Sequence, residues 1–264
     1  MTTTTTPATT ATAPLLSVQG IAKTYPGPRR TRNPVIREVS LDLAPGEFVS
    51  VIGPSGCGKS TLFQMLAGIL HPDQGQVTYH GPATRGPWSA YMPQKDLLLP
   101  WLTAQDNAAL GLTLAGTPKK EARAKVAELL STFRLTGYEK AYPFDLSGGM
   151  RQRVALLRTM VLNRPVLLLD EPFGALDYLT RTELQLWLSH VCTDLGLSTI
   201  LITHDIPEAL ILSDRVYVLS DKPAAVRMVL EQPQPRPRTL DFMKTEQFTQ
   251  NEQLLLDTLT HIND

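Results

Sequence analysis

The chain has 264 residues, and its 25 lysines and arginines balance its 25 aspartates and glutamates. A neutral chain has no long-range field to attract a nucleic-acid backbone or an anionic membrane surface, and no apolar run approaches the ~18–20 residues that cross a bilayer. Composition therefore predicts a globular protein of one large or two modest domains, and it argues against an integral membrane protein or a disulfide scaffold.

The N-terminal third begins with a leader and then becomes strand-like. Residues 1–14 are almost entirely threonine, alanine and proline, which predicts a disordered leader rather than a signal peptide. Alternating apolar and polar residues then indicate antiparallel strands, and one continuous apolar run indicates a strand buried on both faces. The expected elements are strands at 16–21, 35–43 and 47–52, a helix from Lys59 to about Leu70, and a strand at 76–79.

The middle of the chain changes to helical periodicity. Apolar residues recur at helical spacing through 117–133, with lysine, arginine and glutamate between them. Thr117 is the expected N-cap of this helix and Pro118 its first residue. We therefore predict an inserted helical subdomain at about residues 95–164.

The last part alternates short apolar runs with helical patterns, which is typical of a parallel sheet. The strands are expected at 166–169, 199–202 and 216–219, and the helices at 180–192 and 207–212. Three prolines between 231 and 238 predict an extended linker, and a terminal amphipathic helix is expected at 245–262. The predicted division is a leader at 1–14, an α/β domain at 15–230, and a linker with a C-terminal helix at 231–264.

A glycine-rich segment lies between the buried strand at 47–52 and the helix that follows. Glycines allow successive backbone N–H groups to surround a polyphosphate, and the helix N-terminus adds its positive end. We therefore expect a nucleotide-binding P-loop, in which Lys59 contacts the β- and γ-phosphates and Ser60 contacts Mg²⁺. The residues are Gly53, Pro54, Ser55, Gly56, Cys57, Gly58, Lys59 and Ser60, followed by Thr61.

A second acidic element is needed to hold the metal, and an apolar strand at 166–169 ends in Asp170 and Glu171. Adjacent carboxylates at a strand end can divide the chemistry between them. We predict that Asp170 serves Mg²⁺ and that Glu171 is the general base for a water in line with the γ-phosphate.

The segment Leu146–Arg153, which reads LSGGMRQR, makes the resemblance specific. It is similar to the signature sequence of ATP-binding cassette (ABC) ATPases and lies twenty residues ahead of the acidic strand. Further elements resemble that family in the same order, over about residues 16–230. They are Tyr25 for adenine stacking, Gln94 as the Q-loop glutamine that contacts Mg²⁺ or the attacking water, Asp177 in the D-loop, and His204 as the switch histidine.

This resemblance implies an α/β fold with a P-loop NTPase (RecA-like) core, an antiparallel β subdomain and an inserted α-helical subdomain. It also implies ATP and Mg²⁺ as cofactors, with Ser60, Gln94 and Asp170 around the metal. In this family the signature motif of one subunit closes over the γ-phosphate at the P-loop of the other, so a dimer is expected. Ser147, Gly148 and Gly149 would make that contact.

The segment Leu97–Trp101 is too apolar for a solvent loop. Two interpretations remain open: it packs within the helical subdomain, or it lines a groove for a helix of a membrane permease. The sequence Leu-Leu-Pro-Trp at the end of this segment resembles the ATPases of nitrate, sulfonate, taurine and thiamine-pyrimidine importers. That implies permease partners, indirectly a substrate-binding protein, a homodimer, and a place at the cytoplasmic face of the cell membrane.

Other classes of P-loop protein remain as alternatives. About thirty residues follow the last strand, too few for the regulatory domain of sugar-importer ATPases. A soluble ABC ATPase acting on nucleic acid or ribosomes would share the nucleotide motifs. The zero net charge of the chain argues against a nucleic-acid partner. A P-loop kinase or GTPase would not explain the signature at Leu146–Met150.

Overall fold

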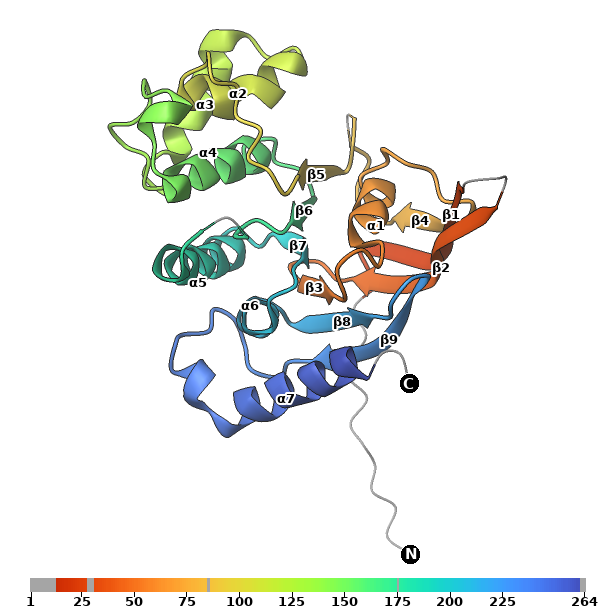
Figure 1. Cartoon of the computed structure of the whole chain (residues 1–264). Helices are drawn as coiled ribbons and strands as arrows, with labels where there is room; N and C mark the ends of the chain where they lie inside the picture. The colour runs from red at the N-terminus through yellow and green to blue at the C-terminus, as the bar shows by residue number, and fades with distance from the viewer. Residues whose placement is uncertain (1–12, 28–30, 85, 175, 262–264) are drawn as a thin grey trace, which may run out of the picture.

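The computed structural model describes residues 13–27, 31–84, 86–174 and 176–261 (Figure 1). The first twelve residues of the expected leader lie outside the described residues. Among those described, no helix combines the length and apolarity needed to span a membrane.

The strands of the described residues form one continuous nine-stranded sheet in the order β4-β1-β2-β9-β8-β3-β7-β6-β5. Strands β8, β3, β7, β6 and β5 run parallel, whereas β1 pairs antiparallel with β2 and β4. The sheet therefore has a parallel half and a mainly antiparallel half. The bounds are β1 Leu16–Pro26, β2 Arg32–Leu43, β3 Phe48–Ile52, β4 Gln74–Tyr79, β5 Ser89–Met92, β6 Val166–Asp170, β7 Ser198–Ile202, β8 Arg215–Leu219 and β9 Ala224–Glu231.

Helices α2, α3 and α4 form a separate layer to one side of the sheet, while α5, α6 and α7 lie along it (Figure 1). This arrangement confirms the expected fold class, a P-loop core with an antiparallel β part and an inserted helical part. The helices are α1 Lys59–Leu66, α2 Ala104–Leu114, α3 Lys119–Leu129, α4 Gly148–Met160, α5 Tyr178–Asp194, α6 Ile206–Leu212 and α7 Glu246–Thr260, with 3-10 turns at Pro143–Asp145 and Phe242–Lys244.

The central strands carry the apolar runs that predict them. All five residues of β3, of β6 and of β7 are buried, as expected for strands covered on both faces. Parallel pairing brings the carboxyl ends of these strands to one edge of the sheet, where ligands of open α/β sheets collect. The P-loop follows β3, the acidic pair ends β6, and His204 follows β7.

Helices α1 and α3 have boundaries that differ from the prediction. Helix α1 ends at Leu66 rather than near Leu70, because Gly68 adopts a left-handed conformation (φ 71°) that terminates it. Pro118, not Thr117, is the N-cap of α3, since its ψ of 138° is extended. Thr117 instead donates its backbone N–H to Leu112 O and so belongs to the turn that closes α2. Helix α3 ends at Leu129, short of the predicted 133.

The C-terminal segment is docked more firmly than a linker. Strand β9 was not predicted from the sequence, and it pairs antiparallel with β8. After β9 the chain has no helix or strand up to the 3-10 turn at Phe242, but Arg238 is fully buried and donates to the carbonyls of Leu210, Ile211 and Ser213 at the end of α6. Phe248 and Leu255 of α7 are buried in an apolar cluster with residues of α6 and β8.

Candidate nucleotide-binding site

The loop between β3 and α1 requires its glycines. Gly56 and Gly58 have φ values of 79° and 121°, which residues with a side chain rarely adopt. A Cβ on Gly58 would lie 2.8 Å from Val35 Cγ1 of β2. Lys59 is almost fully buried, and its Nζ donates to Gly53 O at 2.7 Å and Pro54 O at 2.9 Å. Two carbonyl groups of the loop therefore hold the Lys59 ammonium in place.

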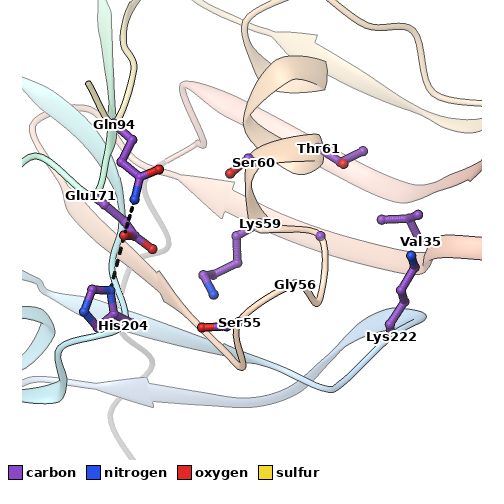
Figure 2. Close-up of a pocket in the computed structure, with 11 residues that line it drawn as sticks. Val35, Ser55, Gly56, Lys59, Ser60, Thr61, Gln94, Glu171, His204 and Lys222 are labelled. Carbon is purple, nitrogen blue, oxygen red and sulfur yellow. Dashed lines mark hydrogen bonds and ion pairs between the residues drawn. The ribbon is translucent and has the colours of Figure 1, made fainter. Parts of the chain in front are cut away.

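This loop forms one wall of a cavity of about 550 Å³, named here the P-loop pocket (Figure 2). Most of the predicted P-loop residues line it: Ser55, Gly56, Gly58, Lys59, Ser60 and Thr61. Gln94, Glu171 and His204 form part of its lining as well, although they come from distant parts of the chain. Gly53, Pro54 and Cys57 do not line the cavity. Cys57 is buried, and this burial raises the pKa of its thiol.

Glu171 is held between two polar side chains (Figure 2). Its Oε2 accepts a hydrogen bond from Gln94 Nε2 at 2.8 Å and lies 3.3 Å from His204 Nδ1. The Glu171 backbone is left-handed, with φ 45°, a conformation that non-glycine residues hold at some cost and that clusters at functional sites. A carboxylate oriented in this way can accept a proton from a water molecule in the pocket.

Asp170 lies deeper than Glu171. It is 4% exposed, and Tyr91 donates its hydroxyl to Asp170 Oδ2 at 3.1 Å. Burial raises the pKa of Asp170, and the charge of Glu171 adds to the rise; hydrogen bonds from Tyr91 and Ser60 and the charge of Lys59 oppose it. Burial of the Tyr91 hydroxyl raises the pKa of Tyr91, and the charge of Asp170 adds to this rise.

The oxygen atoms of Asp170 and Ser60 suit a hard cation such as Mg²⁺, which takes one or two carboxylates together with substrate phosphates. The Ser60 hydroxyl lies close enough to Asp170 to lower the pKa of that carboxyl. Within the described residues there is no cluster of three or more His, Cys, Asp or Glu side chains that could hold a metal. One carboxylate and one hydroxyl fit a metal that arrives with a phosphate ligand.

The predicted signature residues lie elsewhere. Gly148 lines a second cavity of about 590 Å³, the signature hollow, together with Arg151, Gln152 and Leu176. Gln94, Glu171 and His204 line this hollow too, so these three side chains separate it from the P-loop pocket. Ser147 is the N-cap of α4, accepting a hydrogen bond from Met150 N at 3.2 Å.

Gly149 has a packing role that the sequence did not reveal. A Cβ at this position would lie 2.7 Å from Thr180 Cγ2, whereas a Cβ on Gly148 would meet Leu176 at an ordinary 3.5 Å. Only Gly149 is therefore required by the close approach of α4 to α5.

Two predicted nucleotide contacts are not brought into the P-loop pocket. Tyr25 lies at the end of β1 opposite Asn33 and lines a separate hollow with Arg32 and Asp73. Asp177 is the N-cap of α5: it accepts a hydrogen bond from Thr180 N at 3.1 Å, and the hydrogen bonds from Thr180 lower its pKa. Tyr25 is half-buried and Asp177 is exposed, and neither lines the P-loop pocket.

Three residues of the site were missed by sequence reasoning. Val35 and Lys222 line the P-loop pocket, and Tyr91 holds Asp170. Tyr91 lies in β5, which pairs with β6, so a prediction of adjacent parallel strands would have located it. Val35 and Lys222 belong to no local motif and had no signal in the sequence.

The apolar segment Leu97–Trp101 packs only in part within the helical subdomain, as its first interpretation expects; its second, a permease groove, stays a prediction. Leu98 packs against the core of the helical subdomain, and Arg158 donates to Leu97 O at 2.9 Å. The side chains of Leu97 and Trp101 point outward, at 57% and 70% exposure. The segment is thus anchored from within and presents two large apolar side chains on the surface.

Comparison with known proteins agrees with this geometry. Residues 36–174 match the family model described as ABC transporter. The nitrate import ATP-binding protein NrtC of Synechococcus elongatus is 40% identical over 239 residues, covering 88% of this chain and 36% of NrtC. The aliphatic sulfonates import ATP-binding protein SsuB of Bacillus cereus is 41% identical over 226 residues, covering 85% and 88%.

Other curated relatives are named for import of taurine, in Chromobacterium violaceum, and of formylaminopyrimidine, in Halalkalibacterium halodurans, at 41% and 44% identity over 83% and 72% of this chain. They are matched over 83% and 75% of their own lengths. Among solved structures, the dimeric bacterial ABC transporter cassette MJ0796 has a TM-score of 0.70 and 27% identity. It is covered completely and matches 85% of this chain.

Proposed function

The chain belongs to the ABC transporter family, whose cassettes bind and hydrolyse ATP, and we propose that it energises import of a small molecule of the nitrate, sulfonate, taurine or thiamine-precursor type. The observation that carries the proposal is the P-loop pocket itself. There Glu171 is oriented by Gln94 and His204 across from Lys59 and Ser60. The named relatives favour import over the alternative of an ABC ATPase acting on nucleic acid.

The chemistry is assigned to residues as follows. The N–H groups of the P-loop and the Lys59 ammonium bind the β- and γ-phosphates of ATP, and Tyr25 stacks on adenine beside the pocket. Ser60, Asp170 and Gln94 would hold Mg²⁺, which neutralises charge on the phosphates when bound. Glu171 takes the proton from the attacking water, and His204 orients that water and Glu171.

We propose that hydrolysis needs two copies of the chain. The signature residues Ser147, Gly148 and Gly149 line or border a hollow that Gln94, Glu171 and His204 separate from the P-loop pocket of the same chain. A second copy would present its signature helix α4, with its N-terminus toward the γ-phosphate. Asp177 would contribute to the same interface. The dimeric state of the similar cassette MJ0796 supports this arrangement.

The proposed membrane partner is a separate permease, working with a substrate-binding protein. The support is the exposed pair Leu97 and Trp101, anchored on the helical subdomain and continuous with Gln94 along the chain. An apolar contact there suits a cytoplasmic helix of the permease. The chain would then lie at the cytoplasmic face of the cell membrane as a homodimer.

The test is reconstitution of the chain with its permease and binding protein in vesicles. We expect ATP hydrolysis to rise when the cognate small molecule is added, with nitrate, an alkanesulfonate, taurine and a formylaminopyrimidine as the probes. The Glu171→Gln complex serves as the control and should show no rise. Stimulation by an exported lipid or drug without a binding protein would overturn the importer assignment.

A further inference from the structure

The switch histidine is not held by burial of its own ring. The His204 side chain is 57% exposed, so packing contributes little to its orientation. Its distance of 3.3 Å from Glu171 must therefore be set by the backbone of the turn between β7 and α6. What fixes that turn decides how His204 meets Glu171.

The residues on both sides of His204 are tied together. Thr203 Oγ1 accepts a hydrogen bond from Asp205 N at 3.0 Å and donates to Glu208 Oε2 at 3.1 Å. Glu208 N in turn donates to Asp205 Oδ1 at 2.9 Å, so Asp205 is the N-cap of α6. These three hydrogen bonds therefore join Glu208 to Thr203 and Asp205, the two residues that flank His204.

Glu208 is fully buried in the first turn of α6, a costly position for a carboxyl group. Burial raises its pKa to about 8, and the charge of Asp205 adds to the rise; Thr203, Arg181 and Gln185 oppose it. An apolar residue would fit this site at lower cost. Its Oε2 accepts the hydrogen bond from Thr203, which ties the buried carboxyl to the turn that carries His204.

A second tie runs from the same turn to the segment after Glu171. Arg181, on α5, donates hydrogen bonds from both ends of its guanidinium. Nη1 donates to Asp205 Oδ2 at 3.3 Å, and Nη2 donates to Leu176 O at 2.9 Å. Leu176 immediately precedes Asp177 and lines the signature hollow. One guanidinium thereby joins the His204 turn to the segment that borders the proposed second subunit.

We propose that Glu208 and Arg181 are positioning residues for ATP hydrolysis, which hold the His204 turn against Glu171 and tie it to the Leu176–Asp177 segment. They act through His204 and do not contact the nucleotide pocket, since neither lines it. The inference rests on the proposed role of His204.

The test compares two substitutions of similar bulk in the full chain. Glu208→Leu removes the acceptor for Thr203, and we expect kcat to fall about tenfold, because one positioning hydrogen bond is lost, with ATP affinity unchanged. Glu208→Gln keeps an acceptor oxygen and should stay within about twofold of the original kcat. Ser189→Ala removes a buried hydroxyl on α5 that has no hydrogen-bond partner among the described residues; it is the control for a buried change outside this network and should retain kcat.

Thr203→Val guards against a Glu208→Leu protein that does not fold. It removes the hydroxyl from the other side of the same bond, and it should also lower kcat without weakening ATP binding. Equal kcat for Glu208→Leu and Glu208→Gln, or a fall in ATP affinity that matches the fall in kcat, would overturn the proposal. His204→Ala is measured in parallel. If it lowers kcat while the Glu208 and Thr203 variants do not, only this inference fails; if it leaves kcat unchanged, the role proposed for His204 fails first.

Discussion

The P-loop pocket and the signature hollow share a wall but differ in what else surrounds them. Gln94, Glu171 and His204 line both cavities. The P-loop pocket adds Lys59, Ser60 and left-handed glycines from one continuous loop, whereas the signature hollow adds Gly148 and Arg151 from a helix of another subdomain. The first has what a polyphosphate needs within one chain. The second offers the N-terminus of α4, which is the part that the proposed second copy would supply to a bound phosphate.

Substitution of the shared wall should give the largest effect. Glu171→Gln keeps the hydrogen bond to Gln94 but cannot accept a proton, so we expect hydrolysis to fall by about 10²–10⁴. ATP binding should persist, and a closed dimer should accumulate with ATP in size-exclusion chromatography. Glu121→Gln, an exposed carboxyl on α3, is the matched control. Near-original turnover in Glu171→Gln would remove Glu171 as the general base.

ATP affinity should then distinguish the P-loop pocket from the signature hollow. Lys59→Ala removes charge-assisted hydrogen bonds to phosphate, worth about 1.5–3 kcal/mol each, so ATP affinity should fall on the order of ten- to a hundredfold. Ser147→Ala changes a residue outside the P-loop pocket and should leave the affinity of the single chain unaltered while lowering hydrolysis. Both affinities can be measured by titration with a fluorescent ATP analogue. Equal losses in the two variants would contradict the separation of the cavities.

The signature glycines should differ in stability. Gly149→Ala places a Cβ 2.7 Å from Thr180 and should destabilise the packing of α4 on α5 by about 1–3 kcal/mol. Gly148→Ala meets only an ordinary contact at 3.5 Å and serves as the control. Urea denaturation of both proteins provides the comparison. A similar midpoint for the two would show that α4 and α5 can separate without cost.

A further prediction concerns the pH dependence of stability, through Glu208 beneath the shared wall. The carboxyl of Glu208 has an ordinary pKa of 4.5 and is raised to about 8 in the fold, where it faces Asp205, Arg181, Thr203 and Gln185. The folded chain therefore keeps a proton that the unfolded chain releases above 4.5. This group makes folding stability decrease as pH rises from 4.5 to about 8. Glu208→Gln cannot titrate, so its urea midpoint should depend less on pH across this window; an identical dependence would contradict the shift.

Sequence reasoning was strongest where a local pattern carries its own chemistry. The apolar strand, the glycines and the lysine of residues 47–60 are contiguous, and the fold places them as expected, as it does the strand that ends in Asp170. Prediction from the sequence was weaker at helix ends. The extended ψ of Pro118 and the left-handed turn at Gly68 depend on how the chain leaves each helix, which periodicity does not report.

By itself, the sequence determined the family, the fold class and the residues of the P-loop, because these depend on short segments whose backbone and chemistry are local. Only the tertiary structure decided which side chains meet. Gln94 and Glu171 are 77 residues apart and share a hydrogen bond because β5 and β6 are neighbours in the sheet. The burial of Glu208, the contact that Gly149 permits and the docking of Arg238 on α6 likewise arise from packing between distant elements, which no single segment encodes.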